Sequence, residues 1–235
     1  MKKHLSVLML FARSSIYKLL GLLILMAAAE AALFLLVLGR SPDSPLEMIF
    51  SQGKTAIVCG VAFVLYTALL CLTGCEFGSK QGYTLRRLRV SEWGIYFWQA
   101  GYNLCCYLIF WFVQLAAALL LCRLYMSRGG GPQDVFLVFY RNSFMHSLLP
   151  LDETSRYIRN LLLAPALGLA TAYFPLCQRY GRPAAGTVIL TGLTLGLFAD
   201  AMGGLGTDVI VILLSVLFAA ASVCGVYNRR KCYET

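Results

Sequence analysis

Charged side chains are scarce in this 235-residue sequence, because Asp, Glu, Lys and Arg together make up only 13% of it. An average soluble domain has about twice that share. Hydrophobic residues supply 59% of the chain, and its mean hydropathy is +0.72. Such a chain has too few polar side chains to coat a globule of this size, so the sequence predicts that its solvent is lipid.

Histidine and recognisable reaction motifs are also nearly absent. The chain has only His4 and His146, and it contains neither an H-E-x-x-H zinc motif nor a G-x-S-x-G nucleophile elbow. Gly53-Lys54-Thr55 resembles the end of a phosphate-binding loop, but Met48 stands where the first glycine of that loop belongs. We therefore expect no enzyme activity, no metal site and no cofactor in this chain.

Cysteine, by contrast, occurs nine times, almost always inside apolar stretches. In such surroundings a free cysteine behaves as a small hydrophobic residue. Since two histidines leave little to complete a metal site, we predict that the cysteines fill space rather than bind metal or form a disulfide framework.

Six apolar stretches approach the roughly 20 residues that a helix needs to cross a hydrocarbon core. They cover about residues 19–38, 55–74, 95–121, 160–176, 184–200 and 209–227, of which the fifth is short and rich in glycine. The sequence thus predicts an all-α integral membrane protein, with one six-helix transmembrane domain over residues 1–235.

The basic residues predict how these spans are oriented. The net charge is +9, and 13 of the 20 Lys and Arg residues fall on the side that holds both termini. The positive-inside rule then places both termini in the cytoplasm. No continuous basic stripe follows the chain, so we expect no nucleic-acid partner.

The predicted outer loops contain turn signals and one further helix. Residues 41–45 read Ser-Pro-Asp-Ser-Pro, a turn-forming composition, and residues 129–132 read Gly-Gly-Gly-Pro, which should break the third helix. Residues 134–149 are partly apolar and are expected to form an interfacial helix between spans three and four, capped by a polar residue before Val135.

Two acidic residues lie near or within the predicted spans. Glu30 falls in the middle of the first span, where an ionised side chain costs about 2.5–3.5 kcal/mol. It is either a pathway residue or the partner in a hydrogen bond from a neighbouring helix, for example from Asn103 or Gln114. Asp200 stands near an outer helix end. It is either an acidic turn residue at the membrane interface or a second pathway residue.

The predicted cytoplasmic loop, residues 76–93, has the most distinctive pattern. Leu85 and Leu88 lie three residues apart in a basic segment, and Ser91 is suited to cap the third span. A short amphipathic element of this kind, lying parallel to the membrane, fits a groove of a cytosolic partner. The alternative is a basic anchor that only fixes orientation.

At this loop the sequence resembles the permease subunits of ABC-2 type transporters. In that family an acidic residue, a basic residue and a Gly-Thr-like turn precede a short coupling helix and the entry into the third span. The residues in those places are Glu76, Lys80, Gly82, Thr84, Leu85, Val90, Ser91 and Trp93. The chain departs from the family in having Val90 for the usual proline and its largest outer loop between spans three and four.

The resemblance implies a division of labour between subunits. Residues 82–93 would be the coupling helix, and ATP with Mg²⁺ would be bound by a separate ABC ATPase subunit. The residues that would contact that ATPase are Glu76, Lys80, Gly82, Tyr83, Thr84, Leu85, Arg86, Leu88, Ser91 and Trp93. A second permease would complete a homo- or heterodimer in the plasma membrane, in bacteria the inner or cytoplasmic membrane.

Three functions are consistent with these features. The first is ATP-driven export of a hydrophobic or amphipathic peptide, lipid or drug-like molecule by alternating access. The second is a membrane assembly or scaffold protein without transport activity, and the third is an ion-coupled carrier that uses Glu30 and Asp200. The third span is rich in aromatic residues, which either line an amphiphile route or face lipid: Tyr96, Phe97, Trp98, Tyr102, Tyr107, Phe110, Trp111 and Phe112.

Overall fold

The computed structural model describes residues 2–41, 44–73, 75, 91–151, 153–179, 181, 183–199 and 205–234. In these ranges every regular element is an α-helix, which confirms the predicted all-α class. The helices are α1 (Lys2–Arg40), α2 (Leu46–Gln52), α3 (Thr55–Leu72), α5 (Glu92–Ser127), α6 (Pro132–Arg141), α7 (Ser143–Leu148), α8 (Thr154–Arg179), α9 (Ala185–Ala199) and α10 (Leu205–Glu234).

Five of these helices, α1, α3, α5, α8 and α10, are long and apolar enough to cross a membrane. They contain five of the six predicted spans, as expected of an α-helical membrane protein. The remaining predicted span, 184–200, corresponds to α9, which is apolar but has only 15 residues. It rises about 22 Å, against a hydrocarbon core of about 30 Å. A sixth crossing and the cytoplasmic side of the termini therefore stay predictions.

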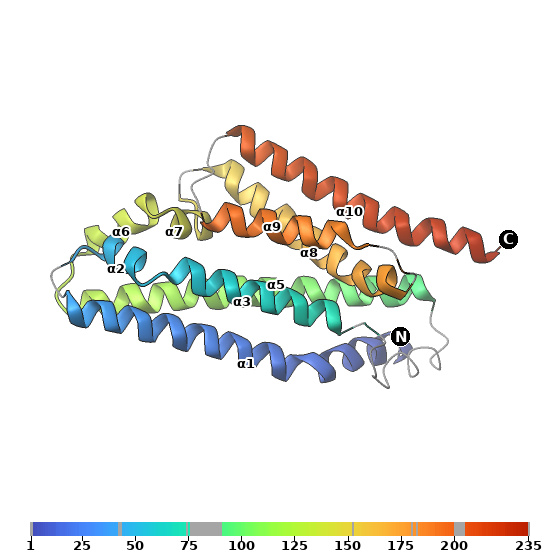
Figure 1. The fold of residues 1–235 in the computed structure, drawn as a ribbon, viewed down its shortest axis with the longest axis horizontal. Coiled ribbons are helices and arrows are strands. Elements are labelled where there is room, and N and C mark those ends of the chain that lie inside the picture. The colour runs from blue at the N-terminus through green and yellow to red at the C-terminus, as the bar shows by residue number, and fades with distance from the viewer. Residues whose placement is uncertain are drawn as a thin grey trace.

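The long helices form two packed groups, as Figure 1 shows. Helices α1, α3 and α5 lie together, α8 packs on α5, and α10 and α9 pack on α8. The labelled N and C ends lie at one end of the bundle, and α2, α6 and α7 gather at the other, which we call the α6–α7 end. Helix α8, in the middle, is the most buried of the five candidate spans.

The contact between α5 and α8 is close because α8 carries a glycine where it meets the α5 backbone. A Cβ atom on Gly168 would lie only 3.2 Å from both the Ala100 carbonyl oxygen and the Leu104 nitrogen. One turn along, the Asn103 amide donates a hydrogen bond to Thr171 Oγ1 at 3.0 Å. Small residues and polar side chains of this kind join helices in lipid, where burial of apolar surface gives no driving force between them.

Aromatic side chains fill the contact between α3 and α5. The Tyr66 hydroxyl donates to the carbonyl oxygen of Cys106 at 2.9 Å, and the Tyr107 hydroxyl donates to Thr67 Oγ1 at 3.2 Å. Phe63 packs on this layer. Six of the eight cysteines whose burial the structure describes are buried, which fits a space-filling role. Within the described ranges no His, Cys, Asp or Glu side chains cluster as metal ligands would.

The sequence correctly predicted where α5 begins and ends. Ser91 caps its start, since its hydroxyl accepts a hydrogen bond from the Gly94 N–H at 3.2 Å. The helix stops at Ser127, just before the predicted break, where Gly129 adopts a positive φ of 100°. Glycine takes that conformation without the steric cost that a Cβ atom would add.

The α6–α7 end differs from the sequence prediction in two respects. The expected interfacial helix over 134–149 is two helices, because Asn142 takes an extended conformation between them and its side chain caps α7 through the Met145 N–H. The expected polar cap before Val135 is wrong. The residue before α6 is Gly131, which has no side chain to cap the helix, and Pro132 lies in the first turn of α6. Helix α2, beyond the predicted turn, was not anticipated.

Candidate functional site

Most of the predicted ATPase-coupling residues lie outside the described residues, as does Asp200. They are Glu76, Lys80, Gly82, Tyr83, Thr84, Leu85, Arg86 and Leu88. Of the two that are described, Ser91 caps α5 and Trp93 packs its ring on Phe97 and, across to α10, on Tyr227. The entry into α5 is thereby fixed against the last helix of the chain.

A cavity of about 970 Å³ among the described residues could bind a ligand. Its walls come from the first half of α3, the middle of α5, the first half of α8 and the end of α9, and α7 closes one side with Phe144 and Leu148. It therefore lies toward the α6–α7 end of the bundle. Its volume is at the upper end of the range of small-molecule sites.

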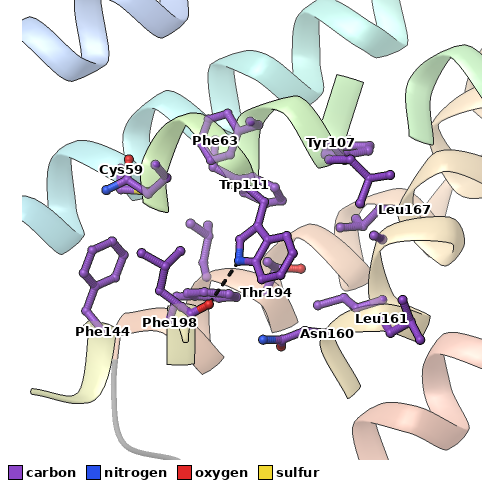
Figure 2. Close-up of a pocket in the computed structure, with 18 of the residues that line it drawn as sticks. Cys59, Phe63, Tyr107, Trp111, Phe144, Asn160, Leu161, Leu167, Thr194 and Phe198 are labelled. Atoms are coloured by element: carbon purple, nitrogen blue, oxygen red, sulfur yellow. Dashed lines mark hydrogen bonds between the residues drawn. The ribbon is translucent and has the colours of Figure 1, made fainter. Parts of the chain in front are cut away.

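The cavity walls are almost entirely apolar. Figure 2 shows Trp111 in the middle of the view, with Phe144 and Phe198 to one side and Leu161 and Leu167 to the other. The indole N–H of Trp111 donates to the Leu148 carbonyl oxygen at 3.2 Å, so even this polar atom is satisfied within the wall. Among the residues that the structure describes, no Asp, Glu, Lys, Arg or His side chain lines the cavity.

Both interpretations of the aromatic third span apply, each to different residues. Tyr107, Phe110 and Trp111 line the cavity, whereas Phe97 and Phe112 are exposed on the outside of the bundle.

The mouth of the cavity lies between α3 and α8. Among its lining residues, Ile57 and Val61 on α3 and Ile158 and Leu161 on α8 are exposed, Leu161 by 72%. Pro165 also lines the cavity, and because it has no N–H, the carbonyl of Leu161 lacks its usual helical donor. The mouth thus opens on an apolar side of the bundle, and the Leu161 carbonyl oxygen at its rim can accept a hydrogen bond.

Glu30 makes one of the two interactions that the sequence proposed for it. The Gln114 amide donates to both of its carboxylate oxygens, at 2.9 and 3.0 Å, whereas Asn103 pairs with Thr171. Glu30 is 1% exposed and Gln114 also lines the cavity. The carboxylate therefore stands directly behind the cavity wall, with a neutral amide between.

Three buried polar atoms on α5 have no hydrogen-bond partner: Gln99 Nε2, Asn103 Oδ1 and Gln114 Oε1. Their residues follow one face of the helix, with Tyr107 between Asn103 and Gln114. Unsatisfied polar atoms are costly inside a protein and more so at membrane depth. This face of α5 can therefore bind polar groups that the chain itself does not supply.

A second polar cluster, which sequence reasoning missed, ties α8 to α10. The Arg159 guanidinium donates to Asp208 at 2.7 Å, and both side chains are 1% exposed. Ser155 donates to the other Asp208 oxygen at 2.8 Å. Arg159 also donates to Asn160, which in turn donates to the Ser147 carbonyl in α7. Arg159 and Asp208 directly precede the apolar stretches 160–176 and 209–227, and this position was the one signal in the sequence for their burial.

Comparisons with known proteins add no family to these observations: no protein-family model matches the chain, and no similar curated protein or solved structure was found.

Proposed function

We propose that this chain is the permease subunit of an ATP-driven transporter of the ABC-2 type, which exports a hydrophobic or amphipathic molecule. The observation that carries the proposal is the apolar cavity of about 970 Å³ with its mouth between α3 and α8. A molecule dissolved in the membrane reaches such a site without crossing water. The resemblance at residues 76–93 supports the choice of ATP as the energy source.

The arrangement of the bundle fits a permease of this kind. The cavity lies toward the α6–α7 end, whereas α3 ends and α5 begins away from it, and the loop proposed to contact an ATPase lies between these two helices in the sequence. Transport requires that a motion of that loop alters the cavity. Helices α3 and α5 flank the loop and also supply cavity walls, so they connect the two directly.

The first experiment is co-purification of the tagged chain in mild detergent. We expect an ATPase subunit to accompany the wild type and to be lost from a variant carrying Leu85→Asp and Leu88→Asp. The control carries Arg229→Asp and Arg230→Asp, which change charge on the same predicted side of the membrane and should leave the ATPase bound. Gel filtration of each variant checks that it is folded.

A second experiment separates transport from scaffolding. Ala164→Trp would fill the cavity, and Val209→Trp places the same ring on the exposed face of α10. We expect the first variant to abolish substrate-stimulated ATP hydrolysis by the complex and the second to retain it. If no ATPase accompanies the wild-type chain, the permease proposal is overturned and a scaffold role takes its place.

A further inference from the structure

The cavity is flanked by one charge that no cation in the described part of the chain neutralises. The ion pairs in those ranges join Arg156 to Glu153, Arg159 to Asp208 and Arg179 to Glu92. None of them involves Glu30, whose carboxylate receives hydrogen bonds from the neutral Gln114 side chain. The buried Glu30 carboxylate therefore lacks a positive counter-charge in this part of the chain, and a cationic ligand can provide one.

Two cavity-lining residues place that carboxylate within reach of a ligand. Cys59 lines the cavity from α3, which packs on α1, the helix that carries Glu30. Gln114 on α5 lines it as well, and its Oε1 atom is a buried acceptor without a partner. A ligand at this wall therefore has the Gln114 side chain between itself and the Glu30 carboxylate. In surroundings of low dielectric constant, the attraction of a charge across one side chain is substantial.

The remaining walls favour a cation that is large and apolar. Phe63, Tyr107, Phe110 and Trp111 present aromatic rings along the same side of the cavity, and aromatic faces attract cations. The apolar walls offer nothing to replace the water around a small inorganic ion. Arg156 and Arg159, at the start of α8, are each paired with an acid, so they do not make the electrostatic potential in the cavity positive.

We infer that the cavity is a binding site for lipophilic cations, molecules with an aromatic or alkyl body and one positive charge, and that Glu30 with Gln114 selects for that charge. The ligand enters from the hydrocarbon region between α3 and α8. This inference names the class of substrate for the proposed function. The role of the cavity in transport rests on that proposed function, whereas binding of the cation itself needs no ATPase.

The test uses two probes of nearly the same shape and opposite charge, tetraphenylphosphonium and tetraphenylborate. Binding of each to the full-length purified chain in detergent is measured by equilibrium dialysis, against micelles without protein. We expect saturable binding of the phosphonium and at least about tenfold weaker binding of the borate. Ala164→Trp, which fills the cavity, should abolish the phosphonium signal.

Glu30→Gln then tests the charge itself. It keeps the size and hydrogen-bonding capacity of the side chain, and we expect it to weaken phosphonium binding at least about tenfold while leaving borate binding equal or stronger. Glu92→Gln, at a half-exposed position near the start of α5, is the matched control and should bind like the wild type. Melting curves establish that each variant is folded.

Two results would overturn the inference: equal affinity of the wild type for the two probes, or unchanged phosphonium binding in folded Glu30→Gln. Its failure is distinguishable from failure of the proposed function. Phosphonium binding without a co-purifying ATPase would leave a cation-binding membrane protein that is not an ABC permease. A co-purifying ATPase without phosphonium binding would leave a permease for another class of molecule.

Discussion

Among the residues that the structure describes, two acids, Asp208 and Glu30, are deeply buried, and their charges are balanced in different ways. Asp208 pairs with Arg159 at 2.7 Å and also accepts from Ser155, so its charge is balanced and both of its oxygens are bonded. Glu30 receives its hydrogen bonds from one neutral amide, whose own oxygen is left without a partner. Both acids are 1% exposed.

This difference teaches that burial of an acid is not by itself a sign of function. The Arg159–Asp208 pair is complete within the chain, so it can serve only to fasten α10 to α8. The Glu30–Gln114 contact is incomplete within the chain, and it borders a cavity. A third contact, between Asn103 and Thr171, involves no charge. The three contacts thus range from a full ion pair to a neutral hydrogen bond, and the contribution of each to the free energy of unfolding can be compared.

The largest loss of stability is expected for Arg159→Leu. Removing one partner of a buried ion pair leaves an uncompensated charge, and comparable cases cost about 3–5 kcal/mol. Unfolding in mixed detergent micelles measures the free energy change. The double variant with Asp208→Leu should recover a large part of the loss, and a double variant as unstable as the single one would show that packing, not charge, dominates at this site.

Gln114→Leu should have an intermediate effect. It deprives the buried Glu30 carboxylate of both hydrogen bonds, and a bond to a charged group contributes about 1.5–3 kcal/mol. The same unfolding assay reports it. Adding Glu30→Leu should restore most of the stability, because no buried charge then remains. A Gln114→Leu chain as stable as the wild type would place Glu30 in the neutral form and weaken the contrast with Asp208.

Thr171→Val removes the uncharged contact and should cost less. The Asn103 amide loses its 3.0 Å partner while the shape of the side chain is kept, and bonds of this kind between membrane helices average about 0.6 kcal/mol. The measurement is again the free energy of unfolding. A loss as large as that of Gln114→Leu would mean that position in the α5–α8 contact matters more than charge.

Glu92→Gln should have the smallest effect. Its ion pair with Arg179 is 3.7 Å long and partly exposed, and exposed pairs contribute about 0–1 kcal/mol. We expect a change in unfolding free energy within about 0.5 kcal/mol at moderate salt. A larger change would indicate that this end of the bundle is shielded from water.

Local features of the fold were predictable from the sequence because their causes are local. Ser91 caps α5 through a residue three positions on, and the glycine run after Ser127 cannot continue a helix. The contact from Gln114 to Glu30 was also among the predictions, since an acid in the middle of a span needs a polar neighbour.

The remaining features depend on contacts between distant segments. Arg159 and Asp208 stand near span ends, where charges are usually solvated, and only the packing of α10 on α8 buries them. The division of the helix at Asn142 and the existence of α2 depend on how these short segments pack at the α6–α7 end. The cavity arises from five helices together, so no periodicity in any one of them indicates it.

The short helix α9 has a consequence for the lipid around the protein. Its 15 residues rise about 22 Å, and it exposes Val188 and Ile189 on its surface. A bilayer that contacts a hydrophobic surface shorter than its own core thins locally, or the flanking polar residues extend outward to meet it. Either response shortens the path from hydrocarbon to water beside α9, a wall of the cavity. In the proposed export, such a deformation of the membrane would lower the barrier to a departing amphiphile.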